Sequence, residues 1–372
     1  MSAYLVKRIL TMIPTLLGIM LITFFIVRLA PGNPATLKLQ AAQGLKETAV
    51  SQELTDQMLK LYGLKVDLPA GYEAFIAKVT EAIYGSDPKD KPHASRRALE
   101  WLGQNGIQFK IWLGNVLVLN FGNSFKDHRP VLDKIKEALP ITLTLNLIEF
   151  LLAYLVSIPL GVYAALRRES FLDKGVMVLL FVLYSLPTFW VAYLLLMYFA
   201  SGDHLNWFPM GGLHSEGVEN YPFFMKLGNY AWHLVLPVVT MVYGSFAFIT
   251  RFSRTTMLEV VKQDYVRTAW AKGLPKRKVI WKHAFRNSLI PQITLLGTLL
   301  PALLGGSVII EQIFSIPGMG KLAFEAIGSR DYPTVMAITT ISAFLTLLSL
   351  LLSDIAYAIA DPRISFEEKQ SA

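Results

Sequence analysis

The sequence has no cysteine among its 372 residues, so disulfide bonds and cysteine-ligated metal sites are excluded. Its six histidines are scattered, and none belongs to a His-Glu-x-x-His or similar motif with metal-ligand spacing, so we expect no metal site. The sequence also lacks a Gly-x-Ser-x-Gly motif and a pair of carboxylates placed for acid–base chemistry. These absences argue against an enzyme.

Charge is scarce as well. Only 17% of the residues are charged, whereas 53% are hydrophobic and the mean hydropathy is +0.44. Soluble domains carry about 25% charged residues, and here the deficit is concentrated in long uncharged runs, which indicates an integral membrane protein. The net charge of +8 would also suit nucleic-acid binding. We do not expect nucleic acid as a partner, because the basic residues lie between aliphatic runs, as in the positive-inside bias.

Six apolar runs are long enough to cross a bilayer. The first, residues 9–27, follows two basic residues and could also be a signal peptide, but its length and Pro14 favour a retained span. The other five runs are 141–166, 175–202, 229–250, 287–310 and 332–353. An even number of spans places both termini on one side, and the basic loop after the second span predicts that this side is the cytoplasm.

The runs divide the chain into four segments. We expect an N-terminal transmembrane helix at 1–30, an external segment at 31–138, a core of five helices at 139–361 and a cytoplasmic tail at 362–372. The external segment is rich in charge; residues 51–61 resemble a capped amphipathic helix, and residues 101–119 resemble a packed or interfacial helix.

The connection at 251–289 carries ten basic residues and only two acids, so it should be cytoplasmic. It also predicts a helical corner: Gly273 suits a left-handed position after a first helix, and Pro275 prevents that helix from continuing. A second helix is expected from Pro275 to about Asn287. Two short helices joined by a tight turn at a glycine are typical of a surface that another protein binds. The basic residues could equally serve only as a topology signal and contact lipid headgroups.

No GxxxxGK[ST] motif is present, so the chain cannot hydrolyse ATP through a P-loop of its own. Active transport would then need another protein or an ion gradient.

Acidic residues within spans point to ion-coupled carriers, but only Glu149 lies clearly within one, and it could simply hydrogen-bond a neighbouring helix. Residues 311–333 predict either a re-entrant element with a short helix at 321–327 or an ordinary surface loop. The candidate pathway or gate residues are Glu149, Glu311, Pro317 and Asp354.

Motifs spread over most of the chain resemble those of the permease subunits of peptide-importing ABC transporters, the dipeptide/oligopeptide B-type family. They are YVRTAxAKGL at 265–274, WxHAxRN at 281–287, RxAPGxP at 28–34, YGL at 62–64, FGxS at 121–124, FxxPGxG at 314–320, RDYP at 330–333 and DxxYxxxDPR at 354–363. Residues 199–202, 232–237 and 361–367 look similar to the Yej-type B subunit of the oligopeptide and microcin C importer. One departure is Arg267-Thr268-Ala269, where the general importer signature has Glu-Ala-Ala.

The resemblance implies the type I ABC importer permease fold, an all-α membrane protein of six helices with an enlarged external segment between helices 1 and 2. It implies four kinds of partner: a homologous second permease, an external solute-binding protein, the peptide substrate, and cytoplasmic ATPase domains on two chains or one fused chain. ATP and Mg²⁺ would bind those ATPases. A short rigid helix, with Ala269 and Gly273 allowing close approach, would transmit their motion. The implied coupling residues are Tyr265, Arg267, Thr268, Ala269, Lys272, Gly273 and Arg286.

We therefore expect a non-enzymatic permease subunit in the bacterial inner membrane that imports oligopeptides or peptide-like compounds, such as microcin C, using ATP hydrolysed by its partners. The alternative is a stand-alone ion-coupled carrier or channel, whose uptake would collapse with the ion gradient. A membrane scaffold without transport activity is a third possibility, but it gives no reason for the glycine corner.

Overall fold

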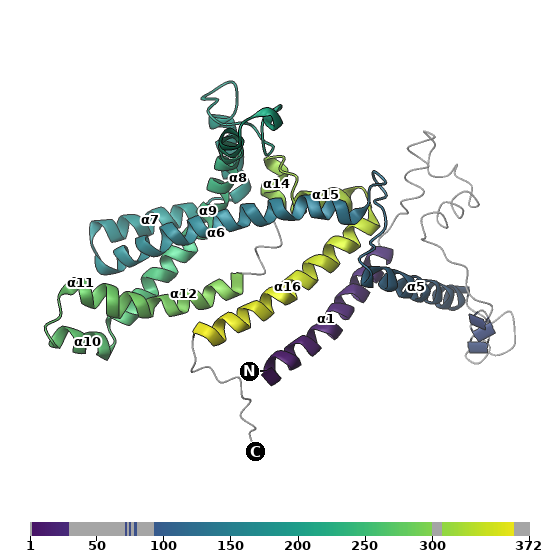
Figure 1. Ribbon diagram of the computed structural model, residues 1–372, viewed down its shortest axis with the longest axis horizontal. Coiled ribbons are helices and arrows are strands. Elements are labelled where there is room, and N and C mark those ends of the chain that lie inside the picture. Colours follow the sequence, from purple (N-terminus) through teal and green to yellow (C-terminus); the bar gives the residue numbers. More distant parts are fainter. Residues whose placement is uncertain are drawn as a thin grey trace, which may run out of the picture. The chain divides into compact units, whose positions relative to one another are not determined.

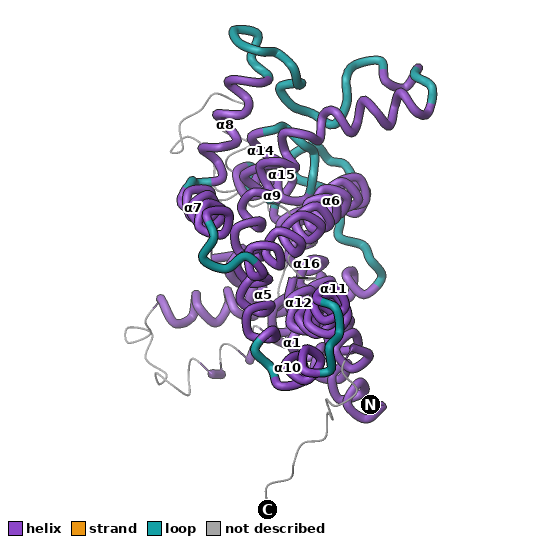
Figure 2. The backbone as a smooth tube through the Cα atoms, turned by 90° about the vertical axis from the view of Figure 1, so that its left-hand side faces the viewer, coloured by secondary structure: helices purple, strands orange, loops and turns teal. Residues whose placement is uncertain are grey.

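The computed structural model describes residues 2–29, 71–72, 74–75, 78–79, 93–299 and 307–360. Across these ranges the regular structure is helical, and the described residues form no β-strand (Figure 2). The predicted helix at 51–61 and the predicted tail at 362–372 lie outside them. An all-α chain is what the long apolar runs predict, because a helix satisfies its backbone hydrogen bonds within one segment.

Four described helices are long and apolar enough to cross a membrane. They are α1 (Ser2–Leu29), α6 (Val131–Leu166), α9 (Phe223–Val261) and α16 (Tyr332–Ala360) (Figure 1). Many of their large apolar side chains are exposed, which is the surface expected of helices that face lipid or another subunit. Helix α6 begins at Val131, inside the predicted external segment.

The run predicted as one span at 175–202 forms two helices. Helix α7 (Phe171–Ser185) and helix α8 (Thr188–Phe199) meet at an angle of 94°. The break lies at Leu186 and Pro187, both of which have extended backbone angles. Proline forces the residue before it out of the helical region, so the bend has a local cause. Counting the pair as one bent span gives five candidate spans in the described residues.

The predicted fifth span at 287–310 lies partly outside the described residues, since 300–306 are among those not described. Helix α12 (Arg286–Leu299) covers its first part and helix α14 (Val308–Ile313) its end. The remaining described α-helices of four residues or more are α5 (His93–Leu117), α10 (Asp264–Ala271) and α15 (Met319–Gly328). Six spans therefore remain a prediction, whereas the packed helix expected near 101–119 is present as α5.

The chain forms two compact units, one of residues 1–14, 135–325 and 341–372 and one of residues 15–134 and 326–340. The first unit contains apolar clusters between α6, α8, α9 and α14 and between α6, α9 and α10. The second contains a smaller aromatic cluster around Phe24, which packs with Phe109, Trp112 and Met336.

Candidate functional site

The connection between α9 and α12 is built as the sequence predicts up to its corner. Helix α10 ends at Ala271, and Gly273 adopts a left-handed conformation with φ +74°. Its N–H donates to the Trp270 carbonyl at 2.9 Å, and Pro275 then starts a new helix, with Lys278 N–H donating to its carbonyl at 2.8 Å. Glycine enters this conformation without the steric clash that a Cβ causes.

The predicted end of the second helix, near Asn287, is wrong. Helix α11 (Lys276–Lys278) continues as a π-helix, η3 (Val279–Phe285), and directly into α12, which ends at Leu299. No glycine stands near Asn287, and Pro291 is accommodated within α12. The second arm of the corner is thus continuous with the helix that carries the next apolar run.

The inner face of the corner packs against α6 and α9, which belong to the same compact unit as the corner itself. Val266 and Ala269 of α10 are buried with Val279, Ile280 and Ala284 of the second arm. The same cluster includes Val162 and Ala165 of α6 and Met257 of α9, so α10 and the start of the second arm pack against the C-terminal ends of those two helices. The corner is therefore a rigid, packed element. Ala269 contributes to this internal packing, so its small size serves contact within the chain.

The outer face holds the other six residues predicted for coupling, all of them exposed: Tyr265, Arg267, Thr268, Lys272, Gly273 and Arg286. Arg267 makes only a loose ion pair with Asp264, at 3.8 Å, with side chains 72% and 97% exposed. Such a surface pair contributes little to stability, which leaves both charges available to a partner.

Sequence reasoning missed two large side chains on this surface. Trp270 is 43% exposed and Trp281 is 50% exposed, although tryptophan is usually well buried. Exposed tryptophans on the two arms of a rigid corner are typical anchor residues of an interface. Their position beside the basic residues in the sequence was the signal that could have identified them.

The predicted pathway residues do not form one cluster. Glu149 of α6 is partly buried and hydrogen-bonds Ser245 of α9, as the alternative interpretation expected. Asp354 of α16 forms an ion pair of 3.0 Å with Arg8 of α1. Pro317 is exposed. A role in transport stays a prediction for each of them.

Glu311 is held by an unusually complete set of contacts. Its side chain is buried; Thr142 Oγ1 of α6 donates to Oε1 at 2.9 Å, and the Lys321 N–H in the first turn of α15 donates to Oε2 at 2.9 Å. Met319 N–H, also at the start of α15, donates to Thr142 Oγ1 at 2.8 Å. Glu311 and Thr142 thus take up N–H groups that the first turn of a helix cannot satisfy by itself.

The glycines of the FxxPGxG motif make this arrangement possible. A Cβ at Gly318 would lie 2.5 Å from Glu311 Cδ and 2.6 Å from Thr142 Oγ1. A Cβ at Gly320 would lie 2.8 Å from the Val308 backbone. The motif is therefore explained by close backbone approach to a buried carboxylate, and Glu311 anchors α15 to α6 and α14.

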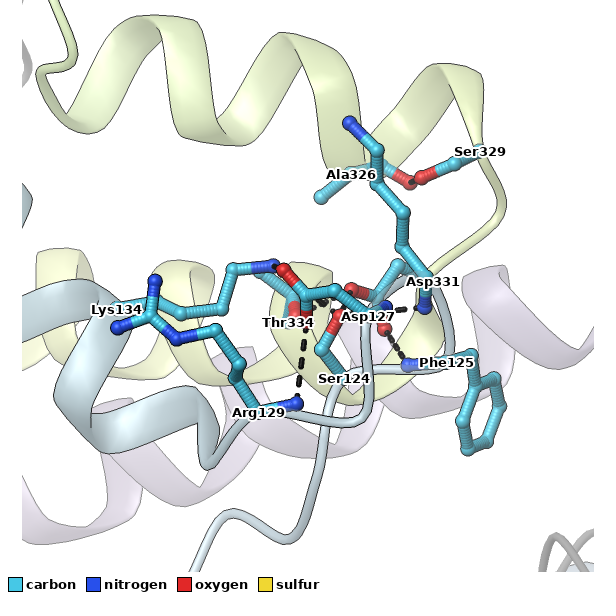
Figure 3. A network of polar contacts seen from close by, with 10 residues as sticks. Ser124, Phe125, Asp127, Arg129, Lys134, Ala326, Ser329, Asp331 and Thr334 are labelled. Atoms are coloured by element: carbon cyan, nitrogen blue, oxygen red, sulfur yellow. Dashed lines mark hydrogen bonds and ion pairs between the residues drawn. The ribbon is translucent and has the colours of Figure 1, made fainter.

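Two other motifs meet in the second unit, as Figure 3 shows. Ser124 Oγ and Phe125 N–H, the latter at 2.7 Å, donate to the carboxylate of Asp331, which also accepts Thr334 Oγ1 at 2.6 Å. Ser124, Asp331 and Thr334 are buried. The FGxS and RDYP motifs thus form one hydrogen-bonded tie between the loop before α6 and the start of α16, which no local pattern in the sequence indicated.

The tie extends to a charged pair at its edge. Lys134 Nζ donates to Ser124 Oγ at 3.1 Å and to Asp127 Oδ2 at 2.8 Å. Partial burial disfavours the Asp127 carboxylate, but hydrogen bonds from Lys134, Ser124 and the Arg129 N–H outweigh it and lower the pKa of Asp127 to about 2. The loop is therefore fixed by an ionised aspartate at neutral pH.

A family described as the inner membrane component of binding-protein-dependent transport systems matches residues 157–366. The chain belongs to this family. The match includes the whole helical corner, the Glu311 anchor and α16. Within the described residues, no group of His, Cys, Asp or Glu side chains has the arrangement of a metal site.

Curated relatives match over nearly the full length of the chain. It is 37% identical to the oligopeptide transport system permease protein AppB of Bacillus subtilis over 98% of this chain and 100% of that protein. It is 35% identical to the inner membrane ABC transporter permease protein YejB of Escherichia coli O157:H7, and 33% identical to the peptidoglycan transport system permease protein YejB of Agrobacterium fabrum. Each of these two matches covers 99% of this chain and 100% of the relative.

These findings confirm the predicted family and fold class, an all-α, multi-pass ABC permease subunit. They favour that prediction over a stand-alone ion-coupled carrier or channel.

Proposed function

We propose that this chain is one of two membrane subunits of an ATP-driven importer for oligopeptides or peptide-like compounds. The observation that carries the proposal is the rigid corner at α10 and α11, which is packed on its inner face and presents exposed aromatic and basic side chains on its outer face. The chain has no P-loop, so an ATP-driven cycle needs such a docking surface for a separate ATPase.

The substrate class rests on the relatives, which are named for oligopeptide and peptidoglycan transport. The shared chemistry of those two names is a peptide chain, so we assign peptides and peptide-containing compounds. The similarity to Yej-type proteins supports the narrower proposal that the substrates include microcin C-like peptides.

The assembly would contain a second permease, one fused or two separate ATPases that bind ATP and Mg²⁺, and an external binding protein. The basic corner would face the cytoplasm together with both termini. ATP-driven closure of the ATPases would move the corner and shift the two permeases between inward- and outward-open states. Arg267, in place of the usual glutamate, would then meet an acidic or polar position on the ATPase.

The test is to purify the chain with its native partners and measure ATP hydrolysis with and without the binding protein and defined peptides. The proposal predicts that peptide-loaded binding protein stimulates hydrolysis severalfold, whereas the binding protein without peptide stimulates it less. Hydrolysis that never responds to any peptide would contradict the substrate assignment.

A further inference from the structure

A charged pair joins α7 to α9 near the helical corner. Arg254 Nε donates to Asp173 Oδ1 at 2.7 Å, and Nη2 donates to Oδ2 at 2.7 Å. This is the parallel, two-bond geometry that makes an arginine–carboxylate pair strong and directional. Asp173 is only 3% exposed. The Arg254 side chain is 22% exposed, so this charged clamp joins a buried carboxylate to a partly exposed guanidinium.

The carboxylate is fixed from its own side as well. Glu169 N–H donates to Asp173 Oδ2 at 2.9 Å, and the Asp173 N–H donates to Ser170 Oγ, the N-cap of α7, at 3.2 Å. Asp173 lies in the first turn of α7, and these bonds fix its carboxylate and backbone to the residues that begin the helix. A displacement of Arg254 would therefore act on the start of α7.

Arg254 lies on the C-terminal part of α9, which packs against α10. One turn further along α9, Met257 is fully buried against Val266 and Ala269 of α10. One turn before Arg254, Gly161 of α6 packs so closely against α9 that a Cβ there would lie 2.5 Å from the Thr250 carbonyl oxygen. This part of α9 is thus packed against both α10 and α6 and tied to α7.

Helix α7 has few other buried groups. Asp173 and Leu180 are its only buried residues, and most of its large apolar side chains are exposed. It nevertheless packs along α9 and forms the first half of the bent pair α7–α8. The charged pair thus adds a directional polar link to the packing that holds α7 along α9.

We propose that the Asp173–Arg254 pair is a positioning link that transmits movement of the α10 corner through α9 to α7, the first half of the bent span. The inference rests on the proposed function, because it assumes that a partner drives the corner. An arginine–carboxylate fork suits this task, since two parallel bonds resist sliding and rotation, whereas apolar contacts between helices allow both.

The test measures peptide taken up per ATP hydrolysed by the whole complex in proteoliposomes. Asp173→Asn and Arg254→Gln each remove the ionic fork, and both should lower this ratio by about tenfold while ATP hydrolysis without peptide stays within about twofold of wild type. The reciprocal exchange Asp173→Arg with Arg254→Asp should recover part of the loss. Lys174→Gln, an exposed charge change next to Asp173, should leave the ratio unchanged.

A wild-type ratio in both single variants would overturn the link. If those variants fail to assemble, Arg254→Lys decides the matter, because it keeps the charge but loses the fork. We expect an assembled Arg254→Lys complex with a ratio reduced by about threefold; an unchanged ratio overturns the link. Failure of the proposed function itself looks different, because the wild-type complex would then show no ATP-dependent peptide uptake at all.

Discussion

At the scale of single residues, two buried carboxylates, Asp331 and Glu311, connect separate helices and loops of this chain through hydrogen bonds. Asp331 accepts three hydrogen bonds from Ser124, Phe125 and Thr334, and Glu311 joins Thr142 to the start of α15. The bonds from Ser124 and Phe125 to Asp331, and from Thr142 to Glu311, connect positions far apart in the sequence, so no helical or strand period reveals them. The motifs themselves could be recognised from the sequence, whereas the reason for them could not.

Asp331→Asn tests the tie in the second unit. The amide turns one acceptor into a donor that faces the existing donors, so we expect a loss of about 1–3 kcal/mol of stability. The measurement is the thermal unfolding midpoint of the purified complex. Glu216→Gln, at an exposed acid, is the control and should unfold at the wild-type temperature. Equal midpoints for the two variants would show that the tie is dispensable.

Gly318→Ala tests the anchor at Glu311. The added methyl group would meet the carboxylate and Thr142 at well under van der Waals distance, so we expect a destabilisation of about 1–3 kcal/mol. The matched control is Gly328→Ala at the exposed end of α15, where nothing lies within 4 Å of the new Cβ. That variant should be as stable as wild type or slightly more so. Normal stability of Gly318→Ala would refute the close approach.

At the scale of elements, the sequence predicted the first helix of the corner and the left-handed glycine, because glycine followed by proline is a strong local signal. It did not predict that the second arm runs on into α12, since no cap residue marks an end there. The third apolar run was predicted as one span, although Pro187 gives its break a local cause; the 94° bend accompanies packing of α8 against α9 and α14. The packing of Ala269 likewise depends on tertiary contacts.

Gly273→Leu tests the corner as an element. Nothing lies within 4 Å of a Cβ at this position, so the defect would come from the backbone, where an L-residue in the left-handed region costs about 1–2 kcal/mol. We expect the variant to assemble in the membrane but to hydrolyse ATP with little peptide uptake. Gly273→Asn is the matched control, because asparagine tolerates this conformation, and it should retain most uptake. Normal uptake by the leucine variant would argue against a coupling role.

At the scale of the whole molecule, the chain lacks cysteine, so single cysteines can report its orientation. Glu216 and Lys276 are both exposed and lie in connections predicted to be on opposite sides of the membrane. In intact cells with a permeable outer barrier, Glu216→Cys should react with a membrane-impermeant maleimide, and Lys276→Cys should react only after the membrane is opened. The reverse pattern would invert the proposed topology.

The central claim is that this chain moves peptides with energy from ATP hydrolysed by its partners. The most direct measurement is uptake of a labelled oligopeptide into proteoliposomes that contain the complete complex and the external binding protein. We predict uptake that requires ATP and Mg²⁺, persists when ionophores abolish all ion gradients, and is lost in Gly273→Leu. Uptake that continues without ATP and collapses with the ion gradient would contradict the account.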